Sequence, residues 1–85
     1  MKFSELKKGM LLWRQWLHAS DLLYIKQITR DRATMTEFSL HEHKYQVITK
    51  NVMPRQWWNE YRWIPFRLAR YNDVKIFIRN IFKSI

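Results

Sequence analysis

The stretch from residue 22 to residue 51, LLYIKQITRDRATMTEFSLHEHKYQVITKN, decides the fold predicted for this chain. It holds three runs rich in strand-forming residues: Leu22–Arg30, Ala33–Leu40 and Tyr45–Asn51. Short polar turns at residues 30–32 and 41–43 join these runs. Strand-forming runs joined by tight turns predict an antiparallel meander. The apolar alternation of the first run slips between Ile25 and Ile28, which predicts a β-bulge there.

The residues before this meander predict a helical turn and one more strand. Phe3–Gly9 predicts a single helical turn with Ser4 as its cap, and Gly9 suits a terminating position with a positive φ. MLLWRQWL, residues 10–17, carries large apolar side chains on both alternating faces, which is typical of a strand covered on two sides. Residues 18–21, HASD, are expected to form a polar connector to the next strand.

A second informative stretch is PRQWWNEYRWIPFRLARY, residues 54–71, which mixes six aromatic residues with four arginines and one acid. Pro54 is placed to open a short helix, and Pro65 to interrupt it. Two interpretations of the rings stay open. They are either core residues of a small domain that needs large side chains, or stacking faces beside phosphate-binding arginines. The rings favour the core, whereas the arginines favour binding because the segment is almost entirely positive.

The last segment predicts an amphipathic helix over residues 73–84, with Asn72 or Asp73 as its cap. Apolar side chains recur at helical spacing from Val74 to Ile85, and basic side chains line the opposite flank. We expect the helix to dock on the sheet, which would otherwise have one face uncovered. The alternative is an interfacial helix on a membrane surface. The predicted core comprises Leu23, Ile25, Phe38, Val47, Phe77, Ile81 and Phe82.

Length and composition restrict the organisation of the chain. Eighty-five residues suffice for a single domain, 1–85, with a sheet over 10–53, an aromatic and arginine-rich segment over 54–71 and a helix over 73–84. The absence of cysteine excludes disulfides and thiolate metal sites. The chain starts with a polar stretch and has no apolar run near the ~20 residues that cross a bilayer, so the expected location is the cytoplasm.

The beginning of the chain carries a family resemblance. LKKGM, residues 6–10, leads into the first predicted strand, and LLYIKQI, residues 22–28, forms the next. This order resembles the opening of SH3-like small β-barrels of the Tudor, KOW and translation-factor type, in which a Lys-Gly pair precedes the first strand. The resemblance implies a curved antiparallel sheet of four or five strands with a C-terminal helix closing one end. The expected fold class is therefore α+β, with an SH3-like sheet.

The sequence offers no arrangement of residues typical of catalysis or metal binding. Its seven carboxylates are scattered, and a single glycine excludes a glycine-rich phosphate loop. His41 and His43 are two residues apart, and His18 would have to supply a third metal ligand from another loop. We therefore expect a solvated hairpin tip at these histidines, no bound metal or cofactor, and no enzymatic activity.

The charge of the chain predicts the class of partner. Sixteen basic and seven acidic residues give a formal net charge of +9, which attracts polyanions. The leading interpretation is a small, basic, non-catalytic module that binds nucleic acid, DNA or RNA, mainly through the phosphate backbone. Direct base readout is not expected because the arginine-rich segment is poor in Asn and Gln. The predicted binding residues, with Trp58 as the stacking ring, are Lys26, Arg30, Arg32, Arg55, Trp58, Arg62, Arg67 and Arg70.

The alternative interpretation is a protein-interaction module. Such a module would be a compact phage- or plasmid-encoded inhibitor that docks on an acidic or nucleic-acid-binding surface of an enzyme. Both interpretations use the same positive charge, so the charge does not separate them. A membrane surface is the less favoured partner, and no small-molecule substrate is expected.

Overall fold

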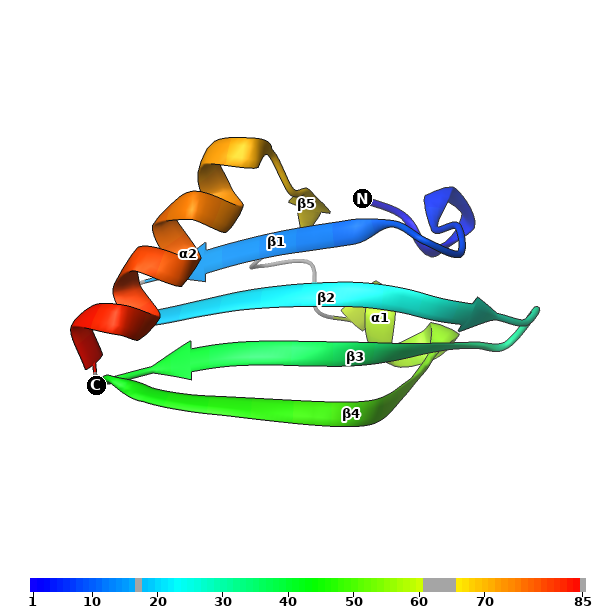
Figure 1. The fold of residues 1–85 in the computed structure, drawn as a ribbon. Coiled ribbons are helices and arrows are strands. Elements are labelled where there is room, and N and C mark those ends of the chain that lie inside the picture. Colours follow the sequence, from blue (N-terminus) through cyan, green and yellow to red (C-terminus); the bar gives the residue numbers. More distant parts are fainter. Residues whose placement is uncertain (17, 61–65, 85) are drawn as a thin grey trace.

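A five-stranded antiparallel sheet forms the centre of the computed structural model, which describes residues 1–16, 18–60 and 66–84 (Figure 1). The strands are β1 (Leu11–Trp16), β2 (Ala19–Ile28), β3 (Arg32–His41), β4 (Lys44–Pro54) and β5 (Arg67–Leu68), and they lie in the order β4-β3-β2-β1-β5. The helical elements are the 3₁₀ turn η1 (Phe3–Glu5), α1 (Arg55–Glu60) and α2 (Tyr71–Ser84). The antiparallel sheet and the C-terminal helix confirm the α+β prediction.

The predicted meander and its bulge are both present. Strands β2, β3 and β4 pair as consecutive antiparallel neighbours, and the register of β2 against β3 shifts between Ile25 and Gln27. The turn between β3 and β4 consists of Glu42 and His43, which have φ angles of 49° and 70°. Positive φ at both central residues is the signature of a type I′ turn, whose twist matches that of the flanking strands. The chain therefore makes this turn without glycine.

The connector predicted at residues 18–21 was wrong, because β2 already begins at Ala19. The carboxylate of Asp21 is buried, but it lies opposite Arg14 of β1 and accepts hydrogen bonds from its guanidinium at 2.9 and 3.2 Å. The Arg14 guanidinium also lies 4.2 Å from the centroid of the Phe66 ring. A buried carboxylate is tolerated in a strand when it is paired in this way. The polar residues Ser20 and Asp21 therefore belong to β2.

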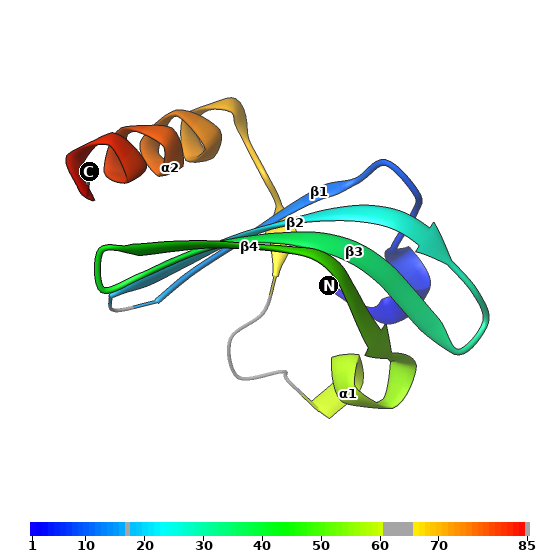
Figure 2. The ribbon, with the colours of Figure 1, turned by 60° about the horizontal axis from the view of Figure 1, so that its bottom comes forward.

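The two faces of the sheet carry separate cores at opposite ends of the strands (Figure 2). One face is covered by η1 and α1, and the other by α2. The core under η1 and α1 contains Phe3, Leu6, Leu12, Leu23, Ile25, Ala33, Met35, Trp58 and Phe66. The core under α2 contains Trp13, Leu22, Leu40 and Phe77. Helix α2 covers only part of its face, because Tyr24 and Val52 on that face are exposed.

Two predicted caps differ from the structure. In η1, Ser4 makes no cap, and the Lys2 backbone amide donates to Glu5 Oε1 at 3.2 Å. In α2, Asp73 is not the residue before the helix but lies in its first turn, where Oδ2 accepts the Arg70 backbone amide at 2.7 Å. This backward reach is one half of a capping box. Gly9 adopts the predicted positive φ, at 91°.

The predicted core was right for the central strands and wrong at two positions. Leu23, Ile25 and Phe77 are buried, and Phe38 and Ile81 are half-buried. Val47 is exposed because β4 is an edge strand that α2 does not cover at this point. Phe82 is 71 % exposed because it lies five residues after the buried Phe77, about 140° around the helix.

The sheet does not close into a barrel within the part of the chain that the structure describes. Strand β4, eleven residues long, forms one edge, and the two-residue strand β5 forms the other. The SH3-like assignment therefore stays a prediction.

Candidate nucleic-acid interface

One end of the sheet gathers three of the predicted arginines, Arg30, Arg32 and Arg55, which we call the basic end. The Arg55 backbone amide donates to the carbonyl of Asp31 at 2.8 Å, so the start of α1 is joined to the turn between β2 and β3. The Arg55 guanidinium donates to the carbonyl of Arg30 at 3.5 Å. Arg32 lies opposite Pro54 in the β3–β4 ladder. Backbone pairing thus brings together arginines that lie 23 and 25 residues apart in the sequence.

The three arginines of the basic end are exposed, and none of them forms an ion pair with a described carboxylate. The ion pairs between described residues are Arg14–Asp21 and Arg67–Asp73, neither of which involves this end. The Arg55 guanidinium lies 5.4 Å from the centroid of the Phe3 ring, and this cation–π contact restrains its direction. A guanidinium without a carboxylate partner keeps its fork of donors for an anion.

Lys26 extends this positive region onto the face of the sheet that also carries α2. It occupies the bulge of β2, and its ammonium reaches across β3 to donate to the carbonyl of Thr49 at 2.7 Å. Thr36 donates to the same carbonyl at 3.1 Å. We call the part of this face beyond α2 the open surface; its exposed residues include Tyr24, Lys26, Gln27, Arg32 and Val52.

Trp58 is a core residue, so its predicted stacking role needs correction. Its ring is 6 % exposed and stacks on Phe66, with centroids 5.3 Å apart and an interplanar angle of 19°. Its indole N–H donates to the carbonyl of Met1 at 2.9 Å. Both ring faces are enclosed by protein, because a domain of this size needs its largest side chains in the core.

Two other predicted arginines, Arg67 and Arg70, lie away from the basic end. Arg67 of β5 donates to both oxygens of Asp73 at 2.7 and 2.9 Å. This bidentate pair lowers the pKa of the Asp73 carboxyl and raises the pKa of Arg67, and the Asp73 carboxylate already occupies the guanidinium of Arg67. Arg70 is exposed just before α2, and its backbone amide donates to Asp73. Arg62 lies outside the described residues.

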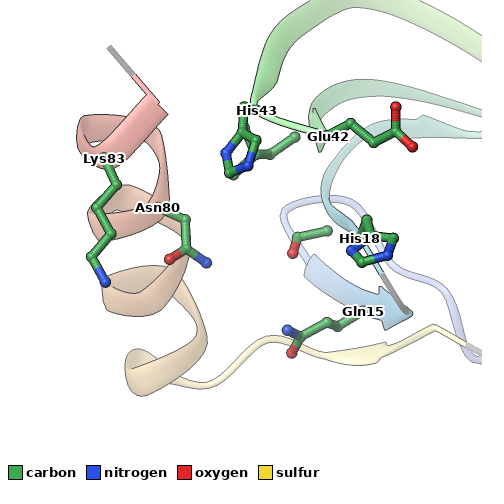
Figure 3. A pocket seen from close by; sticks show the side chains of 8 residues that line it. Gln15, His18, Glu42, His43, Asn80 and Lys83 are labelled. Carbon is green, nitrogen blue, oxygen red and sulfur yellow. The ribbon is translucent and has the colours of Figure 1, made fainter.

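A cleft of about 490 Å³ lies between α2 and the turns at its end of the sheet (Figure 3). It is lined by Gln15, His18, Ser20, Leu40, Glu42, His43, Asn80 and Lys83. Figure 3 shows that Glu42 and Lys83 point away from the space between the elements. Within the described ranges, no group of three or more His, Cys, Asp or Glu side chains is arranged to hold a metal ion. The cleft brings two of the three histidines together but does not make a ligand set.

Sequence reasoning missed Tyr24 as a surface residue. It lies two residues after Leu22 on the same face of β2. Helix α2 covers Leu22 but does not reach Tyr24, which is 43 % exposed. The only signal in the sequence was the alternation of the strand, which places Tyr24 on a face but does not reveal what covers it.

Comparison of the chain with known protein families, curated proteins and solved structures gives no match. None of the helices in the described ranges combines the length and the apolar character needed to cross a membrane.

Proposed function

We propose that this chain is a small, non-catalytic nucleic-acid-binding module that contacts the phosphate backbone with its basic end and with Lys26. The observation that carries the proposal is the grouping of Arg30, Arg32 and Arg55 by backbone hydrogen bonds, with no carboxylate partner among the described residues. Arginines that form no ion pair with a described carboxylate, on a chain of net charge +9, present a site for a polyanion.

The geometry supports phosphate recognition more than base readout. Guanidinium groups bind phosphate oxygens in a bidentate fashion, and such contacts position a protein on nucleic acid without reading its sequence. The three arginines come from a turn, a strand and a helix start, and Arg32 and Arg55 lie towards opposite faces of the sheet, so they offer no single element that would enter a groove. We therefore expect binding with little sequence preference and a strong dependence on salt.

The direct test is binding of fluorescently labelled oligonucleotides at low salt, measured by anisotropy. The double variant Arg30→Ala, Arg32→Ala should bind at least about tenfold more weakly, because charge-assisted hydrogen bonds contribute about 1.5–3 kcal/mol each. The control variant Lys44→Ala, Lys83→Ala removes the same charge from the opposite end of the sheet and should keep most of the affinity. Equal losses in the two double variants would show that net charge alone, and not the basic end, attracts the ligand.

A second candidate function is protein interaction through α2, which the structure supports with a specific surface. Tyr71, Ile78 and Phe82 are exposed and fall on one stripe of the helix at i, i+7 and i+11, and the exposed Lys75, Arg79 and Lys83 lie beside it. Such a stripe fits an apolar groove with an acidic rim. The basic flank argues against a second copy of this chain as the occupant, because like charges would face each other.

A pull-down from a lysate, with and without nuclease, distinguishes the two functions. A single protein that is retained after nuclease and high salt, and is lost on Phe82→Ser, would support the α2 surface. Recovery that depends on intact nucleic acid and on Arg32 would support the basic end instead.

A further inference from the structure

The open surface carries an exposed ring, that of Tyr24. Tyr24 lies opposite Leu11 of β1 and Thr36 of β3, and its ring is 43 % exposed. Leu22, two residues earlier, is buried under α2, so Tyr24 is the first residue of its row beyond the helix. A half-exposed aromatic face on a sheet is the element on which unpaired bases stack.

Positive charge lies on the same face of the sheet as this ring. Lys26 sits in the bulge two residues after Tyr24, and Arg32 lies further along the same face of β3. Among described residues, Glu37 lies opposite the buried Leu23 on the other face, Asp31 is in the turn, and Asp21 is paired with Arg14. The open surface therefore offers the ring of Tyr24 and the cations of Lys26 and Arg32 to an anionic ligand.

The width of the open surface indicates which form of nucleic acid it can contact. Its residues come from β2, β3 and β4. Neighbouring strands are about 4.8 Å apart, so the outer two of these strands are separated by about 10 Å before side chains are added. A major groove about 12 Å wide admits a helix or a two-stranded ribbon, and the minor groove is narrower. A three-stranded face does not enter either groove, and the ring of Tyr24 would lie outside the base stack of a duplex.

We infer that the open surface binds single-stranded nucleic acid, with a base stacked on Tyr24 and the neighbouring phosphates held by Lys26 and Arg32. This inference rests on the proposed function and names the form of its ligand. Stacking is tolerant of sequence because every base presents a flat face, which agrees with phosphate contacts that read no sequence.

The experiment compares three labelled ligands of equal length with the full chain at low salt: a single strand, its duplex, and a strand in which abasic sites replace the bases. The intact chain should bind the single strand about 5- to 150-fold more tightly than the abasic strand, the range expected for one stacked base. Tyr24→Ala should lose this preference without changing the salt dependence, and Tyr24→Phe should keep it. Tyr71→Ala, which removes an exposed ring from α2, is the matched control and should bind as the unchanged chain does.

The outcomes separate the inference from the function on which it rests. Equal affinity for the normal and the abasic strand, or tighter binding of the duplex, would overturn the single-strand inference and leave phosphate binding intact. Because this comparison uses the unchanged chain, it holds even if Tyr24→Ala fails to fold. Absence of binding to all three ligands at low salt would overturn the proposed function itself.

Discussion

The neighbouring residues Trp57 and Trp58 of α1 differ sharply in their burial. Trp58 is 6 % exposed and packs on Phe66, whereas Trp57 is 53 % exposed. We expect Trp58→Ala to lower the free energy of unfolding by about 3–5 kcal/mol, because it removes a large ring from the core. Trp57→Ala should change it by less than about 0.5 kcal/mol. Chemical denaturation of both variants measures the difference, and similar losses would contradict the assignment of Trp58 to the core.

The raised pKa of Glu37 predicts how the stability of the fold depends on pH. Burial raises the pKa of its carboxyl, and the nearby Asp21 raises it further, while Arg14 and the hydrogen bond from Asn51 act in the opposite direction. The folded chain therefore holds this proton more tightly than the unfolded chain, whose pKa is about 4.3. Stability contributed by the protonated form is present below that value and is lost as pH rises through the higher folded pKa.

Glu37→Gln should accordingly be more stable than the unchanged chain at pH 7, and the advantage should shrink towards pH 4. Glutamine is always neutral, and its carbonyl still accepts the Asn51 amide hydrogen bond. Thermal melts across this pH range measure the effect. A variant that is less stable at pH 7 would show that the ionised carboxylate contributes favourably to the fold.

At the scale of elements, Asp73 anchors α2. The hydrogen bonds from Arg67 lower the pKa of this carboxyl, with a further contribution from the Arg70 amide. Stability from the ionised form is present above the unfolded pKa of about 3.9 and is lost as pH falls through the lower folded pKa. Asp73→Asn should cost about 1–2 kcal/mol at pH 7, comparable to the loss of a helix cap, and the cost should vanish in strong acid.

The exposed Asp31 supplies the control for this measurement, because it has no ion-pair partner among described residues. Asp31→Asn should leave the free energy of unfolding nearly unchanged at pH 7. If the two substitutions had equal effects, the pairing of Asp73 with Arg67 would not be the anchor.

The two phenylalanines of α2 test how the helix is oriented. Phe77 is buried with Trp13, whose ring lies edge-on at 6.1 Å between centroids, and Phe82 faces outward. Phe77→Ala should cost about 3–5 kcal/mol, and Phe82→Ala less than about 0.5 kcal/mol. Denaturation curves check the pair, and a large loss from Phe82→Ala would indicate that the helix is rotated relative to the arrangement described here.

Local patterns were sufficient to predict most helices and strands, but not which parts of the sheet the helices cover. The strand runs, the bulge after Ile25 and the C-terminal helix follow from alternation and helical spacing, which are properties of neighbouring residues. The strand position of Asp21 depends on Arg14 of another strand, and no local pattern reveals that pairing. The exposure of Val47 and Phe82 depends on where α2 crosses the sheet, which the sequence of the helix does not specify.

The candidate site was the least predictable part for the same reason. The arginines of residues 54–71 are neighbours in sequence, yet Arg55 joins the turn between β2 and β3, while Arg67 pairs with Asp73. Arg30 and Arg32 meet Arg55 because the register of β3 and β4, with its shift after Met35, places Arg32 opposite Pro54. Sequence could identify these residues by type, but the basic end arises from the register of a hairpin.

At the scale of the whole molecule, the central claim is that a localised group of cations binds nucleic acid phosphates. Four cations carry it: Lys26, Arg30, Arg32 and Arg55. Because each phosphate contact releases counterions, the affinity for a single strand should fall with salt at a log–log slope of about −0.7 per contact, or about −2.8 for four contacts. Net charge without a defined site would give a slope that no single position controls.

The most direct test is therefore the salt dependence of single-strand affinity for Arg32→Ala compared with Lys44→Ala. Each removes one positive charge from the first residue of a strand, at opposite ends of the sheet. We predict that Arg32→Ala makes the slope shallower by about 0.7 and that Lys44→Ala leaves it unchanged. An affinity that does not depend on salt, or slopes altered equally by the two substitutions, would contradict the claim.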